Sequence, residues 1–187
     1  MNIKIITASV RQGRIGPQIS KWVLQSIQEK MNNDVEIIDL KEWYLPLDDE
    51  PYLPATGKYL QHHTQQWSQK IASGDLFVFV FPQYNWGYPA SLKNAVDHLY
   101  AEWNDKVALI VSYANRGGGK AADQFQQIIT GLHMHNLSGR IEVKLKDLQF
   151  NNEEKLIQPS VDLQGYQNML YDLICEAELL LNNPNPV

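Results

Sequence analysis

The sequence has little of several features that would place it in a special class of protein. It contains a single cysteine, Cys175, so no disulfide can form within its 187 residues, as is usual in a reducing compartment. No run approaches the roughly 18 apolar residues that a membrane-spanning helix needs. The chain enters an apolar run directly after Met1, which predicts a cytoplasmic protein without signal peptide or membrane anchor.

Positive charge is also scarce, because 16 Lys and Arg residues face 21 Asp and Glu residues and the net charge is −5. Nucleic acids require a basic face, so we expect no nucleic-acid partner. The histidine spacing does not favour a metal site. His62 and His63 are adjacent and project from different sides of a predicted helix, while His133 and His135 have no nearby carboxylate. Cys175 lies in an apolar segment, which predicts a buried, unreactive thiol.

The apolar runs that are present alternate with helical patterns, which is typical of a parallel sheet covered by helices. Short strands are predicted at residues 3–8, 35–39, 76–81, 107–113 and 141–143. Helices are predicted at residues 17–31, 59–73, 89–103, 120–134 and 161–181, the last followed by Pro184 and Pro186. We therefore expect one α/β domain over residues 1–187, a three-layer sandwich around a five-stranded parallel sheet of order 2-1-3-4-5.

In such a sheet, ligands bind at the carboxyl ends of the strands where the strand order reverses, between strands 1 and 3. The first loop at that point, residues 8–16, lacks both the Walker sequence and the Gly-x-Gly-x-x-Gly fingerprint, which argues for a mononucleotide over a dinucleotide. It combines a hydroxyl, two guanidinium groups and a helix start, which together suit a phosphate. The candidate phosphate ligands are Ser9, Arg11, Arg14, Ile15 and Gly16. The alternative is a helix cap with solvated arginines.

The second loop, residues 82–89, is unusually aromatic and is bracketed by prolines. Aromatic rings in a loop must pack against something, and a flat heterocycle such as a flavin is a good candidate. An asparagine amide suits the mixed donor and acceptor edge of the flavin pyrimidine. The candidate ring contacts are Pro82, Gln83, Tyr84, Asn85 and Trp86. The alternative for Trp86 and Tyr88 is a place in the core or in an interface.

The third loop, residues 112–120, follows the fourth strand and precedes a helix. Consecutive glycines let the backbone approach a ligand closely, and the helix start supplies free N–H donors. Such donors suit the negative charge of a reduced flavin. The candidate residues are Ser112, Tyr113, Gly117, Gly118 and Gly119. The alternative is a flexible loop before a helix.

These motifs resemble those of the NAD(P)H-dependent FMN reductases of flavodoxin-like fold, which include quinone, azo-dye and chromate reductases. The resemblance rests on Ser9-Val10-Arg11, on residues 82–97, and on Ser112-Tyr113 with the glycines that follow. It covers about the first 145 residues, and the tail beyond Lys146 carries nothing diagnostic. Two positions depart from the pattern: Ala8 stands where many members have glycine, and Arg14 where many have a small hydroxyl residue.

The resemblance implies noncovalent FMN, with NADPH or NADH as the hydride donor and a quinone, an azo compound or free flavin as the acceptor. Hydride would pass through flavin N5 in a two-electron ping-pong sequence, so no side chain is assigned as catalytic. Tyr84 and Tyr113 are both candidates to donate a proton to a quinone oxygen, and the sequence does not decide between them or require either. The alternatives are a flavodoxin-type electron carrier and a protein whose redox state controls a partner.

The family also implies a homodimer or homotetramer with the active site at the subunit boundary. The predicted helices at residues 89–103 and 120–134 have more apolar positions than one sheet face needs, and pairing between subunits is one explanation. The long irregular segment 43–58 is rich in proline and acidic residues. It is either a braced surface loop or a border of the ligand cleft or of a subunit contact.

Overall fold

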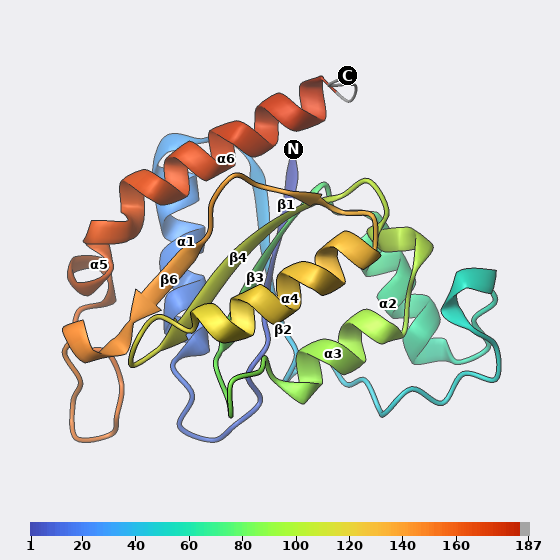
Figure 1. Cartoon of the computed structure of the whole chain (residues 1–187), viewed down its shortest axis with the longest axis horizontal. Helices are drawn as coiled ribbons and strands as arrows, with labels where there is room; N and C mark the ends of the chain where they lie inside the picture. Colours follow the sequence, from blue (N-terminus) through green and yellow to red (C-terminus); the bar gives the residue numbers. More distant parts are fainter. Residues whose placement is uncertain (184–187) are drawn as a thin grey trace.

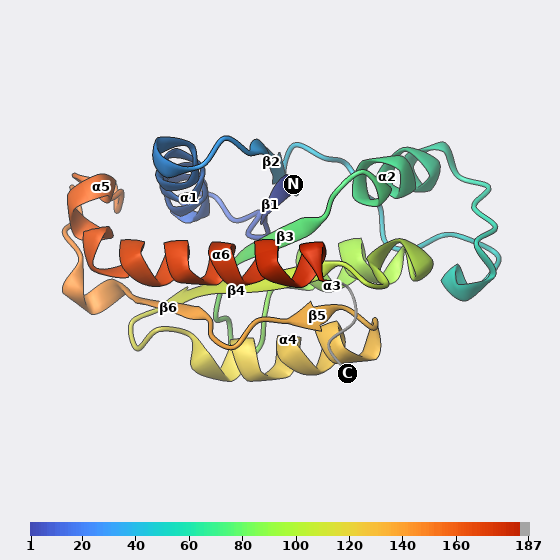
Figure 2. The ribbon, with the colours of Figure 1, turned by 90° about the horizontal axis from the view of Figure 1, so that it is seen from above.

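A computed structural model describes residues 1–183, and Pro184 and Pro186 lie outside the described residues. The chain forms a parallel sheet between two layers of helices (Figure 1). The main strands are β1 (Asn2–Thr7), β2 (Asp34–Asp39), β3 (Leu76–Pro82) and β4 (Val107–Ala114). Their order is β2-β1-β3-β4-β5, as the strand labels show in Figure 2. The predicted fold class and strand order are confirmed.

The fifth position in the sheet is shared by two short segments that both pair with β4. β5 (His135–Asn136) pairs with the start of β4, and β6 (Ile141–Lys144) pairs with its end. The predicted strand at residues 141–143 corresponds to β6. No local pattern predicts β5, because two exposed polar residues lack the alternation or apolar run by which strands are recognised.

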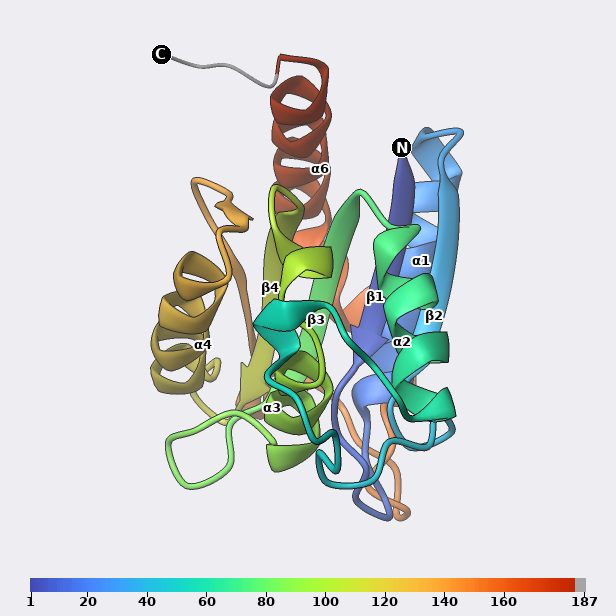
Figure 3. The same ribbon diagram turned by 90° about the vertical axis from the view of Figure 1, so that its right-hand side faces the viewer.

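The helices divide into two sets that cover opposite faces of the sheet. On one face lie α1 (Gly16–Lys30), the short α5 (Pro159–Asp162) and α6 (Gln167–Asn182). On the other lie α2 (His62–Ala72), α3 (Ala90–Asp97) and α4 (Gly119–Gly131), with α2 and α3 nearest the viewer in Figure 3. Short 3₁₀ helices cover Pro54–Thr56, Ala101–Trp103, Leu145–Asp147 and Gln164–Tyr166.

The core under α2, α3 and α4 is aromatic, and it uses the apolar positions of those helices. Phe79 and Phe125 meet edge to face with ring centroids 4.9 Å apart, and both are fully buried. Leu92 and Val96 of α3 and Ile129 of α4 are likewise buried in this core. The apolar residues of these helices are therefore buried in the core of the chain itself, and they give no argument for pairing between subunits.

Two other features concern the surface. The prediction that Cys175 is buried is wrong. Ile174 and Ala177 of α6 face the core of the protein, while Cys175 is turned outward and is exposed. Within residues 1–183, no helix has the length and apolar character to cross a bilayer.

Candidate active site

The candidate site lies at the carboxyl ends of β1, β3 and β4, at the point where the strand order reverses. A cavity of about 840 Å³ opens there, within the usual size range of small-molecule sites. It brings together seven of the predicted residues: Arg11, Arg14, Ile15, Pro82, Gln83, Tyr84 and Tyr113. Its other lining residues are Gln12, Gly13, Ala114, Asn115, Arg116, Leu145, Phe150 and Glu154.

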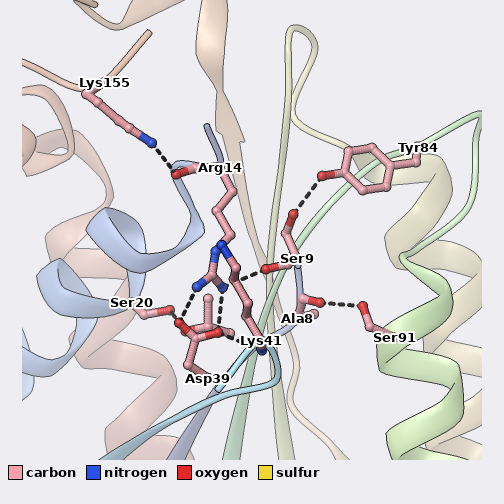
Figure 4. A network of polar contacts seen from close by, with 10 residues as sticks. Ala8, Ser9, Arg14, Ser20, Asp39, Lys41, Tyr84, Ser91 and Lys155 are labelled. Atoms are coloured by element: carbon pink, nitrogen blue, oxygen red, sulfur yellow. Dashed lines mark hydrogen bonds and ion pairs between the residues drawn. The ribbon is translucent and has the colours of Figure 1, made fainter. Parts of the chain in front are cut away.

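The loop of residues 8–16, hereafter the phosphate loop, is held through its carbonyl groups. Ser91 Oγ donates to the carbonyl of Ala8 at 2.6 Å. Arg14 Nη1 donates to the carbonyl of Ser9 at 2.6 Å, and Lys155 Nζ donates to that of Arg14 at 2.8 Å (Figure 4). In a trans peptide the N–H points opposite to the carbonyl. The N–H of each of these three peptides therefore points away from the side chain that binds its carbonyl.

The amides of this loop are unused by the protein itself. Among the described residues, no backbone N–H from Ser9 to Ile15 donates to a protein acceptor. Ser9 and Ile15 are nevertheless buried, and a buried amide without an acceptor is rare in native structures. The loop leads directly into the N-terminus of α1, which adds further free donors and partial positive charge. Such an arrangement fits an anion.

The two arginines of the loop differ in their surroundings. Arg14 forms a two-pronged ion pair with Asp39 at the end of β2, with Nη2 2.7 Å from Oδ2. This pair is largely shielded from solvent, and the carboxylate neutralises the guanidinium. Arg11 is exposed, lies over the ring of Tyr84 at 5.4 Å and has no carboxylate partner among residues 1–183. Arg11 therefore offers a free charge, whereas Arg14 braces the loop.

Tyr113 supplies an unpaired hydroxyl next to the helix start. Its side chain is buried. Its oxygen lies near the Ser9 hydroxyl and the Gly16 amide, but it makes no hydrogen bond of normal length and angle within the described part of the chain. Burial raises the pKa of this phenol, so it stays protonated and able to donate. A Cβ added to Gly16 would lie 2.9 Å from the Tyr113 oxygen, so glycine is needed for this close approach. An orphaned donor beside a helix N-terminus fits a phosphate oxygen.

The loop of residues 82–89, hereafter the aromatic loop, contains a tight turn at its tip. Tyr84 and Gly87 exchange backbone hydrogen bonds of 2.8 and 2.9 Å around Asn85 and Trp86. Both central residues are left-handed, with φ of 47° and 73°, as in a type I′ turn. This conformation suits asparagine but is strained for tryptophan. Trp86 is 63% exposed, and Lys120 Nζ lies 3.8 Å from the centroid of its ring.

The remaining residues of the aromatic loop are held in place by long-range contacts. The Tyr84 hydroxyl is 2.7 Å from Ser9 Oγ, which joins this loop to the phosphate loop. Gln83 Oε1 accepts from the Ala121 amide at 3.3 Å, so its amide nitrogen is left to donate. Tyr88 packs on Phe125 with centroids 5.2 Å apart, so the core interpretation holds for this ring.

In the loop of residues 112–120, hereafter the glycine loop, the glycines lie outside the main cavity, although Tyr113, Asn115 and Arg116 of the same loop line that cavity. Gly117 and Gly118 have φ of 96° and 84°, and Ser112 Oγ donates to the Gly117 carbonyl at 2.9 Å. Ser112 therefore braces the loop from within the core. Gly118 and Gly119 line a second cavity of about 430 Å³ with Trp86, and Gln83 and Arg116 line both cavities. A Cβ on Gly119 would lie 2.8 Å from Glu142 Oε2, so a carboxylate sits close behind this loop.

The tail contributes residues that the sequence did not indicate. Residues 149–157, hereafter the tail hairpin, close through a bridge between Phe150 and Leu156. Phe150 and Glu154 line the main cavity, and Lys155 reaches the phosphate loop. The sequence beyond Lys146 carries nothing diagnostic of the family, so these contacts could not be predicted from it. No periodicity marks this segment, and its position depends on contacts with residues far away in sequence.

The described residues contain no group of three or more His, Cys, Asp or Glu side chains placed to hold a metal ion. The imidazole of His63 is instead 3.0 Å from Asp49 Oδ1, and its ring lies against that of His98 with centroids 5.9 Å apart.

Comparison with known proteins identifies the family of this chain. Residues 1–144 match the family model of the NADPH-dependent FMN reductases. The chain belongs to this family. The family match favours a reductase over a flavodoxin-type carrier, with FMN as its cofactor.

Members of the family from several organisms are similar to this chain. An NAD(P)H-dependent FMN reductase of Schizosaccharomyces pombe is 51% identical over 134 residues, covering 71% of this chain and 67% of its own. One from Saccharomyces cerevisiae is 42% identical over 156 residues, covering 78% and 81%. An NAD(P)H:quinone oxidoreductase of Solanum tuberosum is 35% identical over 135 residues, covering 70% and 68%.

Among solved structures, the flavoenzyme NAD(P)H:(acceptor) oxidoreductase FerB from Paracoccus denitrificans has a similar fold. The TM-score is 0.71 at 15% identity, covering 95% of this chain and 97% of that one. At that identity, the likeness establishes the flavodoxin-like fold of this FMN reductase family member and nothing about its substrates.

Proposed function

We propose that this family member transfers reducing equivalents from NAD(P)H to a quinone or a similar small acceptor, with FMN held in the main cavity. The observation that carries the proposal is the set of unused donors at the phosphate loop. The amides of residues 9–15 and the buried Tyr113 hydroxyl have no protein acceptor among residues 1–183. A phosphate group supplies the acceptors that these donors lack.

The cavity residues would divide between the two ends of the cofactor. Ser9, Ile15, Gly16 and Tyr113 would hold the phosphate, and the exposed Arg11 would add a charge-assisted hydrogen bond. Arg14 would act by bracing the loop, because its guanidinium already serves Asp39 and the Ser9 carbonyl.

The other end of the cavity would receive the flavin ring. Pro82, Gln83 and Tyr84 line it, and Gln83 Nε2 would donate to the pyrimidine edge of the ring. Asn85 and Trp86, and the glycine loop with Ser112, Gly117, Gly118 and Gly119, lie at or beyond this end. We infer that they shape the entrance for the nicotinamide and the acceptor.

When bound, FMN supplies the redox chemistry, taking a hydride from NAD(P)H and passing two electrons to the acceptor. The protein binds and orients the reactants. Tyr113 holds its proton beside Gly16, at the phosphate end, because burial raises its pKa. Tyr84 hydrogen-bonds Ser9, which fixes its ring between the two loops. We therefore name neither tyrosine as a proton donor to the acceptor.

Titration of the apoprotein with FMN tests the proposal. FMN fluorescence should be quenched at a one-to-one ratio, and riboflavin, which lacks the phosphate, should bind at least about tenfold more weakly because charged hydrogen bonds are lost. Equal affinity for the two flavins would contradict the assignment of the phosphate loop. Steady-state rates with NADPH and a quinone should give parallel double-reciprocal lines, and intersecting lines would exclude the ping-pong order.

We also propose that the chain acts as one domain and pairs with a second copy. α6 and α1 pack on the same core, which supports one domain. The segment between β2 and α2 exposes Tyr44, Leu47 and Leu53, each with more than 70% of its surface accessible. Exposed apolar residues gathered on one segment are typical of an interface. Light scattering should give twice the chain mass, and Leu47→Asp should shift it to the monomer mass.

A further inference from the structure

We propose that the tail hairpin belongs to the flavin-phosphate site, and that Lys155 is a positioning residue that orients the phosphate loop and adds positive charge to it. This inference rests on the proposed function, because it assumes that the phosphate of FMN occupies the loop. It assigns a role to a segment that lies outside the residues matching the family model, which end at 144.

The hairpin is rigid enough to position a side chain. The Asn151 amide donates to the Lys155 carbonyl at 2.8 Å, and the Ile157 amide donates to the Gln149 carbonyl at 3.1 Å. The Asn151 side chain closes the turn by accepting from the Lys155 amide at 2.9 Å. The base of the Lys155 side chain is therefore held by backbone and side-chain bonds on both strands of the hairpin.

The hairpin is also attached directly to the start of α1. Gln18 Nε2 donates to the Leu156 carbonyl at 3.0 Å, and the Leu156 amide donates back to Gln18 Oε1 at 3.0 Å. The side-chain amide of Gln18 thus pairs with the backbone of Leu156 through both its N–H and its oxygen, as a neighbouring strand would. Gln18 lies in the first turn of α1, so the hairpin and the helix N-terminus are joined as one unit.

Lys155 uses this attachment to reach the loop. Its ammonium donates to the Arg14 carbonyl at 2.8 Å, which orients the peptide between Arg14 and Ile15. The Ile15 amide of that peptide points away from Lys155, and Ile15 lines the main cavity. Turning this peptide would replace an N–H donor with a carbonyl oxygen, which repels a phosphate.

The charge of Lys155 matters because its neighbour contributes little. Arg14 is neutralised by Asp39, whereas Lys155 forms no ion pair within residues 1–183. Lys155 and the exposed Arg11 are thus cations without an ion pair close to the loop, and the Glu154 carboxylate lines the same cavity. A half-buried ammonium is screened less by salt than an exposed one, so it should act on a bound phosphate at physiological ionic strength.

The test compares FMN with riboflavin, because only FMN carries the phosphate. Dissociation constants for both flavins are measured by fluorescence quenching for wild type, Lys155→Met, Lys155→Arg and the control Lys146→Met, which changes an exposed lysine without hydrogen bonds in the described chain. Lys155→Met should weaken FMN about tenfold and leave riboflavin within about twofold of wild type. Lys155→Arg should restore most of the FMN affinity.

A second variant guards against a simple loss of structure. Gln18→Ala removes both bonds to the buried Leu156, so it should lower the melting temperature of the apoprotein somewhat, but it should leave a folded protein that binds FMN more weakly while riboflavin binding changes less. Equal weakening of both flavins in Lys155→Met, or FMN affinity unchanged in both variants, would overturn the role of the hairpin. If wild type itself binds neither flavin, the proposed function fails instead.

Discussion

The two ends of the candidate flavin site are built in opposite ways. At the phosphate end, side chains from α3, the loop itself and the tail hairpin hold the carbonyls of the phosphate loop, and the Arg14–Asp39 pair ties it to β2. At the ring end, Asn85 and Trp86 project into solvent from a strained turn.

This difference matches what each end must bind. A phosphate is the same in every turnover, so donors fixed before binding lose no conformational entropy when it arrives. The ring face must admit a nicotinamide and then an acceptor of another shape. An exposed aromatic side chain on a short turn can serve both, since stacking does not depend on one exact partner.

Crowding the start of α1 should break the phosphate end most severely. In Gly16→Val, the first added carbon alone meets the Tyr113 oxygen at 2.9 Å and Thr7 Cγ2 at 3.2 Å. We expect FMN affinity to fall about a hundredfold and the unfolding free energy to fall by about 2 kcal/mol, as for an overpacked site. Gly131→Ala, at the end of α4 where a Cβ meets nothing within 4 Å, is the control: it should leave FMN affinity unchanged and should not lower the unfolding free energy. Wild-type affinity in Gly16→Val would show that the phosphate lies elsewhere.

The two arginines of the loop should separate stability from binding. Arg14→Leu leaves the Asp39 carboxylate without its partner in a shielded place, and we expect it to lower the unfolding free energy by about 2 kcal/mol. Arg11→Leu should leave stability within about 0.5 kcal/mol and weaken FMN about tenfold. Urea denaturation and flavin titration of both variants measure the contrast. If Arg11→Leu were the destabilising variant, the roles would be reversed.

Tyr113→Phe should improve stability while harming binding. Removing a buried hydroxyl that has no partner should raise the unfolding free energy of the apoprotein by about 1 kcal/mol, and FMN affinity should fall about fivefold. Thermal melts with and without FMN compare the two effects. A hydroxyl already satisfied by water would leave the apoprotein unchanged or less stable.

The same variant should alter the response to alkaline pH. Burial raises the pKa of Tyr113 in the folded state, so above about pH 10 the unfolded chain loses this proton while the folded chain keeps it. Below that pH, the ionisation of Tyr113 therefore does not affect the unfolding free energy of the wild type. As the pH rises towards the folded pKa, the unfolding free energy falls. Urea titrations at pH 8 and pH 10.5 should show a smaller loss of stability in Tyr113→Phe than in wild type.

At the ring end, the smallest effects are expected and they concern strain. Trp86→Gly removes a side chain from a left-handed position and should raise the unfolding free energy by about 1 kcal/mol. Trp86→Ala removes the ring but keeps a Cβ at the same backbone angle, so it should not be stabilised. Both variants should keep wild-type FMN affinity and change KM for the acceptor. A loss of FMN in Trp86→Ala would mean that this ring stacks on the cofactor.

The sequence predicted the elements of the fold well because local patterns encode them. Buried parallel strands appear as short apolar runs, and the reversal of strand order then selects the loops after β1 and β3. Most residues predicted for the phosphate loop and the aromatic loop do line the main cavity. The glycine loop follows β4 as predicted, and Tyr113 of this loop lines the main cavity, while Gly118 and Gly119 line the neighbouring one.

What the sequence could not supply are contacts between distant positions. The partner of Arg14 is 25 residues away, and Lys155 is 141 residues from the carbonyl that it holds. Neither pairing leaves a local pattern. The error at Cys175 has a similar origin: the residue has apolar neighbours in the sequence, but it lies on the face of α6 that is turned to solvent.

The division of the last strand into β5 and β6 affects how copies of this protein can meet. Free strand edges invite strands of other molecules, which leads to aggregation. Here one edge is interrupted between Asn136 and Ile141, and the other, β2, carries the charged Glu36 held by Lys4 and Lys70. Neither edge offers a long apolar template. The association of two copies proposed above would then rest on side-chain contacts rather than on pairing between strands.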